Sequence, residues 1–213
     1  MLTQNSELRQ SAWEAMTGNW KPAVIASLVI GVIFYIGAGV FTGCGVSSSF
    51  GISSFIYWVF IFALVMPIHY AFTIIMQNFL NGARENVLED TYNYFKSNYS
   101  RAVITSVLVA VYTALWSLLF IIPGIIKSYS YAMTFYIANE MPEKSSEECV
   151  QLSMKMMYGN KAKLFWLDMS FIGWFLLCAI TFGIAALFVE PYWFTARAAF
   201  YEDLKKETIS IPQ

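Results

Sequence analysis

Charge is scarce in this sequence. Lysine, arginine, aspartate and glutamate together make up 13% of its 213 residues, whereas 58% are hydrophobic. A water-soluble domain of this length has too little interior to bury that much apolar surface. The net charge of -1 and the dispersed cations also exclude the basic face by which proteins bind nucleic acid. We therefore expect an all-α protein, a polytopic bundle of transmembrane helices with membrane lipids around it.

Metal-ligating and nucleophilic side chains are also few. The chain has one histidine, His69, and three cysteines, Cys44, Cys149 and Cys178. The cysteines fall in three separate segments, an expected outer loop, an inner loop and a span, so no two should meet. A metal site needs several ligands together, and an enzyme needs a nucleophile with a base or paired carboxylates. We expect free thiols, no metal, no cofactor and no catalytic activity.

Long apolar runs are what the chain has in abundance. A helix needs about 20 apolar residues to cross the hydrocarbon core. The runs fall into three consecutive helix pairs, which are residues 23–41 with 55–80, 102–122 with 125–138, and 164–189 with 192–204. The second members of the last two pairs are short for a membrane span. We expect them to form re-entrant segments, to thin the bilayer locally or to lie in the membrane interface. Six spans are predicted, and four spans with two interfacial helices are the alternative.

The positions of the cations predict the orientation. All but two of the 13 lysines and arginines lie in polar stretches that flank the apolar runs, and the connector 42–54 has no charge. Short loops rich in lysine and arginine stay in the cytoplasm. We expect a multi-pass protein of the bacterial cytoplasmic membrane with both termini on the cytoplasmic side.

A short pattern occurs three times. Asn19, Asn98 and Asn160 each follow an amphipathic segment and a small residue, and each precedes a cation and a long apolar run. Gly18 and Gly159 suit the left-handed end of a helix, and the cation is expected to snorkel into the head groups. The pattern predicts three pseudo-repeats within one membrane domain of residues 1–213. Their approximate bounds are 3–80, 88–139 and 145–206.

Prolines recur at the ends of apolar runs. Pro123 follows Leu-Phe-Ile-Ile, Pro191 follows Leu-Phe-Val-Glu, and Pro67 is a weaker third copy. Proline removes a helix hydrogen bond and clashes with the preceding turn. We expect the chain to kink or reverse at these positions, and the freed carbonyl groups to need protein or water partners.

Several motifs resemble a known family. Residues 116–131 read WSLLFIIPGIIKSYSY, and Gly-Asn-Lys at 159–161, Ser-Phe-Ile-Gly-Trp at 170–174 and Pro-Tyr at 191–192 follow. This series resembles a bacterial membrane family known only as domain of unknown function 975, DUF975. The resemblance implies a membrane setting and no particular activity, substrate or cofactor. The architecture is also similar to the membrane segments fused to some bacterial glycerophosphodiester phosphodiesterases.

Ionisable groups within apolar runs are candidates for function because they are costly there. His69 could relay protons, but we favour a hydrogen bond to a carbonyl freed by Pro67. Asp168 is expected to pair with Lys161 or Lys163.

Three further charged residues are candidates. Glu190 and Arg197, seven residues apart, would share a helix face and either pair or hold an anionic head group. Lys127 could bind phosphate or snorkel. Together with His69, Asp168, Pro123 and Pro191, these are the candidate ligand or structural residues.

The longest polar stretch contains a helix start. Ser145 or Ser146 before Glu147 and Glu148 is typical of a capping box. The helix that follows would carry an apolar side on which it lies on the membrane surface. That side comprises Cys149, Leu152, Met156 and Met157.

These features predict a non-enzymatic membrane protein that binds lipid or a membrane protein partner, in a scaffold or accessory role. A small transporter or channel with a site at the proline-broken helices is the alternative. An intramembrane enzyme using Asp168, Glu190 or His69 comes third. The sequence leaves the oligomeric state open.

Overall fold

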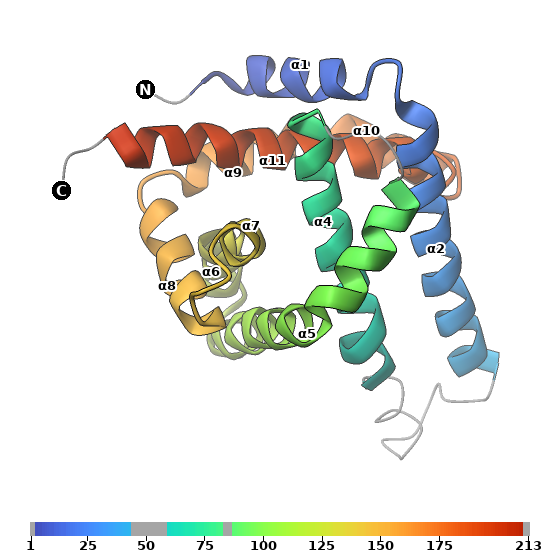
Figure 1. Cartoon of the computed structure of the whole chain (residues 1–213), viewed down its shortest axis with the longest axis horizontal. Coiled ribbons are helices and arrows are strands. Elements are labelled where there is room, and N and C mark those ends of the chain that lie inside the picture. Colours follow the sequence, from blue (N-terminus) through green and yellow to red (C-terminus); the bar gives the residue numbers. More distant parts are fainter. Residues whose placement is uncertain (1–2, 44–58, 83–86, 211–213) are drawn as a thin grey trace.

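A computed structural model describes residues 3–43, 59–82 and 87–210 (Figure 1). Cys44 and most of the connector 42–54 lie outside the described residues. The described residues form helices and no strand, which confirms the all-α prediction. The helices are α1 (Asn5–Met16), α2 (Trp20–Gly43), the π-helix η1 (Ile61–Val65), α4 (Met66–Leu80), α5 (Val87–Leu119), α6 (Ile121–Tyr131), α7 (Thr134–Glu140), α8 (Ser146–Met156), α9 (Lys161–Met169), α10 (Ile172–Ile180) and α11 (Ala186–Ser210).

Helix α11 is central to the packing. It lies beside α1 along much of its length and also contacts α2 and α4 (Figure 1). Phe200 and Tyr201 of α11 are buried with Leu8 and Ala12 of α1 in one hydrophobic cluster. The Thr3 amide and hydroxyl donate to the Asp203 carboxylate, at 2.7 and 2.6 Å. The two ends of the described chain therefore lie together.

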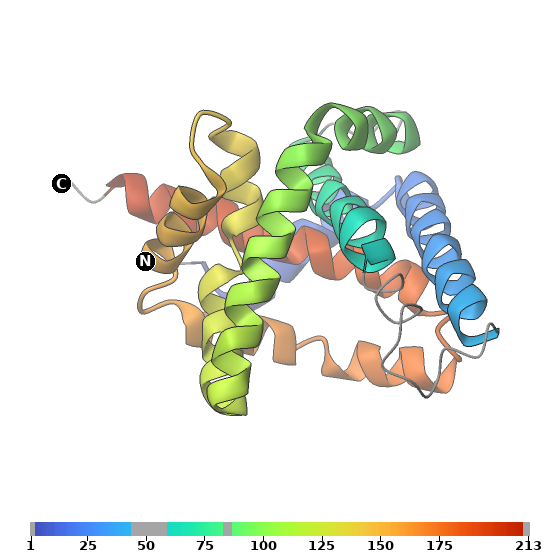
Figure 2. The same cartoon turned by 90° about the horizontal axis from the view of Figure 1, so that it is seen from below.

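Features of local geometry recur at pairs of the three asparagine corners. Gly18 and Gly159 have φ of +83° and +82°, which confirms the left-handed helix ends. Asn98 is the non-helical residue within α5, with φ -113° and ψ 15°, and Figure 2 shows the two halves of α5 (green) running in different directions. The side-chain amides of Asn98 and Asn160 each donate to the carbonyl four residues earlier, both at 3.3 Å.

Two of the cations after these corners bind protein groups instead of snorkelling. Arg101 donates to backbone carbonyl groups of residues 138–144, and Lys163 pairs with Asp203 at 3.7 Å. The snorkelling prediction is therefore wrong for both residues, because each finds protein partners far along the chain.

Three helical segments of the described residues are long and apolar enough to cross a membrane, or four if the α1–α2 pair, bent by 96°, counts as one. They are Ala63–Leu80, Tyr92–Leu119 and Lys161–Ile180, with Asn5–Met16 plus Trp20–Ile33 as the bent pair. The expected short members, residues 125–138 and 192–204, are not among them, since the first is divided between α6 and α7 and the second is part of α11.

Large hydrophobic side chains cover much of the surface. At the tip between α5 and α6, Leu118 is 83% exposed and Ile121 76%, and Phe182 after α10 is 94% exposed. Residues 102–126 and 169–189 carry no charged side chain. Contiguous apolar surface of this kind is typical of contact with lipid or with another protein.

The prolines act differently from one another. The chain reverses at Phe120, whose extended backbone separates α5 from α6, and Pro123 follows in the first turn of α6, where its missing N–H breaks no helix bond. Helix α11 continues through Pro191. The predicted reversal there is wrong, because the chain reverses earlier, at Phe182 and Gly183 with φ of 52° and 89°.

Helix α8 begins as predicted but packs differently. Ser145 caps it, and the Glu148 carboxylate accepts from the Ser145 backbone and side chain, which completes the capping box. Its predicted apolar side, with Cys149 and Met157, is buried in the main hydrophobic cluster. That side contacts protein rather than a membrane surface, which corrects the expected placement.

Candidate functional site

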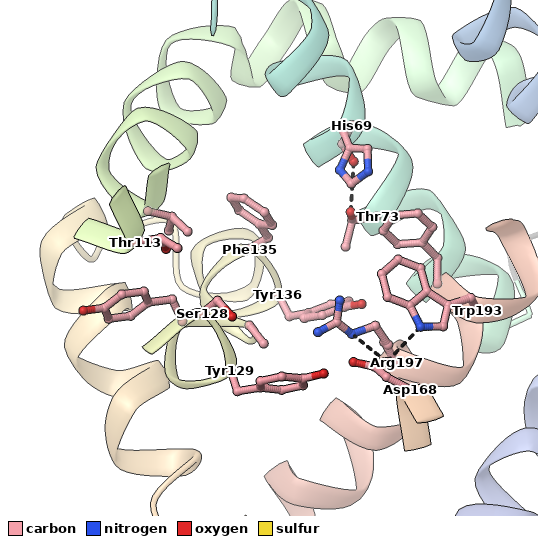
Figure 3. A pocket seen from close by; sticks show the side chains of 14 residues that line it. His69, Thr73, Thr113, Ser128, Tyr129, Phe135, Tyr136, Asp168, Trp193 and Arg197 are labelled. Atoms are coloured by element: carbon pink, nitrogen blue, oxygen red, sulfur yellow. Dashed lines mark hydrogen bonds and ion pairs between the residues drawn. The ribbon is translucent and has the colours of Figure 1, made fainter. Parts of the chain in front are cut away.

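A cavity of about 360 Å³ lies among α4, α5, α6, α7, α9 and α11 (Figure 3). Its walls combine aromatic rings with polar and charged groups. The lining residues include His69, Thr73, Thr113, Ser128, Tyr129, Tyr131, Phe135, Tyr136, Asp168, Trp193, Phe194 and Arg197. An apolar cavity with a few convergent polar groups is typical of a small-molecule site.

Arg197 is fixed from one side. The Trp193 indole donates to Asp168 Oδ1 at 2.8 Å, and Arg197 Nε lies 3.7 Å from the same oxygen. The guanidinium carbon lies 4.7 Å from the Trp193 ring centre. Trp193 and Arg197 are four residues apart in α11 and therefore share a face of the helix. Asp168 and Trp193 together orient the guanidinium.

The far side of Arg197 faces the cavity. Its two terminal nitrogens form no hydrogen bond with any described residue, and the guanidinium points toward the space between Phe135 and Tyr129 (Figure 3). An arginine side chain stays protonated in proteins and carries five N–H donors. The cavity therefore presents unused, positively charged donors.

His69 also faces this cavity. Its ring meets Phe194 edge-on with centroids 4.9 Å apart, and its ring nitrogens make no hydrogen bond to a described residue. The carbonyl that Pro67 frees in the preceding turn, that of Ala63, accepts from the Tyr99 hydroxyl at 2.7 Å. The partner expected for His69 is thus taken by Tyr99.

Two tyrosines complete the polar lining. The Tyr129 hydroxyl points toward Asp168 (Figure 3). Tyr136 stacks on Tyr201 at 4.9 Å and 16°, which fixes its ring on the cavity wall. Both rings line the same cavity as Arg197.

The structure brings together three of the candidate residues, His69, Asp168 and Arg197. The expected Glu190–Arg197 pair does not form, because Arg197 turns to Asp168 and Glu190 is exposed. Lysine is not the partner of Asp168 either, since Lys163 pairs with Asp203.

The other candidates lie elsewhere. Lys127 stacks over Trp116 at 4.5 Å, and neither Pro123 nor Pro191 lines the cavity. Sequence reasoning missed Trp193, Tyr129 and Tyr136. The four-residue spacing of Trp193 and Arg197 could have predicted that they share a helix face, whereas no pattern in the sequence marks the two tyrosines.

A second polar cluster ties α4, α7 and α11 together. The buried Gln77 amide donates to Glu140 at 3.1 Å and Glu202 at 2.8 Å, and Tyr201 and Lys205 donate to Glu140 at 2.9 Å each. The hydrogen bond to Glu140 raises the pKa of Lys205. Every member has a protein partner, so the cluster stabilises the packing. No group of three potential metal ligands occurs in the described ranges.

Comparison with known families covers the second half of the chain. Residues 118–208 match the model of a family described as "Protein of unknown function (DUF975)". This part of the chain is similar to the DUF975 family. The DUF975 match contains Asp168, Trp193 and Arg197, whereas His69 lies before it. No curated protein and no solved structure matches the chain. The DUF975 resemblance is confirmed, and the family description assigns no activity.

Proposed function

We propose that this chain is an integral protein of the bacterial cytoplasmic membrane and that its central cavity binds the anionic head group of a lipid. It would act without catalysis, as a lipid-binding or accessory membrane component. The observation that carries the proposal is Arg197, whose terminal donors face the cavity and have no acceptor among the described residues.

The membrane setting is supported by the distribution of charge and apolar surface. The described chain has three or four segments that could cross a membrane. The uncharged stretches 102–126 and 169–189 end in exposed hydrophobic tips. Lipid would cover these tips at little cost, whereas water would not.

The preference for an anion follows from the arrangement around Arg197. Asp168 contacts the guanidinium only at Nε and at 3.7 Å, a distance beyond a hydrogen bond. A phosphate or carboxylate could accept from the terminal nitrogens in a bidentate geometry. Tyr129 and His69 offer further polar contacts, and the aromatic wall suits the apolar part of an amphiphile.

We also propose that both termini face the cytoplasm and that the fold consists of three related units. The contact between Thr3 and Asp203 supports the common side of the termini. In every unit, the residue four positions after the corner asparagine is buried. These residues are Ala23, Ala102 and Leu164.

Binding is favoured over catalysis and over transport. Asp168, the carboxylate of the cavity, is engaged by Trp193 and Arg197, which leaves it poorly placed to act as a base. A transporter site was expected at the proline-broken helices, but Pro123 and Pro191 are outside the cavity lining.

The test is lipid retention by the purified full chain. Nanodiscs with equal amounts of phosphatidylglycerol and phosphatidylcholine would be stripped stepwise and the bound lipid counted by native mass spectrometry. We expect phosphatidylglycerol to be retained, and Arg197→Ala to lower that retention about tenfold, since charge-assisted hydrogen bonds are worth about 1.5–3 kcal/mol. Arg197→Lys should keep part of the phosphatidylglycerol retention.

Lys206→Ala is the matched control, because Lys206 is an exposed cation of the same helix. It should retain phosphatidylglycerol like the wild type. Equal retention by wild type and Arg197→Ala, with unchanged thermal unfolding, would contradict the proposal.

A further inference from the structure

A second, smaller cavity of about 260 Å³ lies among α5, α6 and α8. Tyr131 lines both cavities. The two cations that lie outside the polar stretches of the sequence are Lys127 and Arg197, and each lines one of these cavities. Each also stacks on a tryptophan, Lys127 over Trp116 and Arg197 over Trp193.

Among the described residues, Lys127 has no partner besides Trp116. Its ammonium lies 4.5 Å from the centre of the Trp116 ring and makes no ion pair or hydrogen bond with a described residue. It is the first charged residue after the uncharged stretch 102–126. Its three N–H donors are available to a ligand in the cavity.

Glu147 lines the same cavity from α8. It accepts one long hydrogen bond from Gln151, at 3.5 Å, and forms no ion pair with Lys127, whose nitrogen therefore lies more than 4.0 Å from its carboxylate oxygens. A positive and a negative group thus share one cavity without pairing with each other.

The cavity lies where polar and apolar surfaces meet. One wall is α8, which presents Glu147 and Gln151, and the other is the α5–α6 hairpin, which ends in the exposed tip at Leu118 and Ile121. Tyr112 and Trp116 also line it, and such rings prefer the level of the lipid head groups.

We propose that this second cavity binds the head group of a zwitterionic phospholipid with a primary ammonium, such as phosphatidylethanolamine. The phosphate accepts from Lys127, the ammonium donates to Glu147, and the acyl chains lie along the α5–α6 tip. A quaternary ammonium has no N–H to donate to Glu147, so a choline head group fits less well. The inference shares only the membrane setting with the proposed function.

The experiment uses the full chain in nanodiscs that contain equal amounts of phosphatidylethanolamine, phosphatidylcholine and phosphatidylglycerol. Native mass spectrometry after stepwise delipidation counts each bound lipid. We expect an ethanolamine-to-choline preference of about tenfold in the wild type, the size of one charge-assisted hydrogen bond. Glu147→Gln should remove this preference, and Lys127→Ala should lower retention of both lipids.

Glu143→Gln and Lys155→Ala are matched controls, since both residues are exposed and outside this cavity. Both should behave as wild type. Arg197→Ala should lose phosphatidylglycerol and keep the ethanolamine preference, which distinguishes failure at one cavity from failure at the other. An ethanolamine preference that survives Glu147→Gln, or one that is absent in the wild type, would overturn the inference.

Discussion

Arg101 shows how a single side chain holds distant segments together. Its guanidinium, at the start of the long half of α5, donates to a loop 37–43 residues away, at 2.8–3.0 Å. The acceptors are the carbonyl groups of Ala138, Met141, Pro142 and Lys144. The sequence predicts a cation after Asn98, but acceptors so far along the chain leave no local pattern to read.

Arg101→Ala should destabilise the protein by about 2–3 kcal/mol, because several carbonyl groups would lose a charged donor. Arg101→Lys should recover less than half of this, since an ammonium cannot span the same acceptors as a guanidinium. Unfolding in mild detergent measures the change. Lys96→Ala, at an exposed position of the same helix, should have little effect, and an equal loss there would contradict the account.

The capping box of α8 should respond to pH. Hydrogen bonds from Ser145 lower the pKa of Glu148 from its ordinary value of 4.5. Because the folded pKa is lower than the unfolded one, the stabilisation is present above pH 4.5 and is lost as the pH falls through the lowered value.

Ser145→Ala should therefore cost about 1 kcal/mol near neutral pH, the usual value of a helix cap. The difference from wild type should shrink as the pH falls through the lowered pKa of Glu148 and its carboxylate becomes protonated. Thermal unfolding of both proteins across this range is the measurement. A mutational effect that does not change with pH would show that the carboxylate has no part in the cap.

At the scale of helices, Gly124 fixes how closely α5 and α6 approach. A Cβ built on Gly124 would lie 2.8 Å from the Cα of Ser117, so any side chain must push the two helices apart. Gly124→Ala should destabilise the hairpin by about 1–3 kcal/mol, as overpacking does. Gly173→Ala in α10 is the control, because nothing lies within 4 Å of its Cβ position. Thermal unfolding that is equal for the two variants would contradict this assignment.

Helix type was easier to predict than helix ends. Hydropathy predicts the apolar stretch 164–189, but the structure divides it among α9, α10 and the start of α11. The divisions occur at Ser170–Phe171, where ψ rises to -14° and -2°, and at Phe182–Gly183, where φ is positive. Phe182 takes a positive φ that its residue type does not favour, so no composition rule marks the turn. The glycine corners were predictable because glycine is the usual residue there.

For the whole molecule, orientation can be tested with thiol reagents. Native Cys149 is buried and should not react from either side, so it cannot report the orientation. Tyr158 is 85% exposed beside α8. With Cys44 and Cys178 changed to Ser, Tyr158→Cys should react only when the cytoplasmic side is accessible. Reaction from the outer side of intact cells would contradict the orientation.

The candidate site was predictable only in part. The sequence indicated His69, Asp168 and Arg197 as candidate functional residues, because ionisable side chains are rare and costly within apolar runs. Their meeting around one cavity depends on α4, α9 and α11 packing together, which no local pattern encodes. Glu190 was indicated by the same rule, yet the direction of its side chain depends on where α11 begins, and that start was not predictable.

The most direct test of the central claim is a high-resolution structure of the full chain in a bilayer that contains phosphatidylglycerol. The account predicts head-group density within hydrogen-bonding distance of the terminal nitrogens of Arg197, with Asp168 and Trp193 holding its other side. A cavity without lipid density, in which the Arg197 guanidinium is fully paired with protein groups, would contradict it.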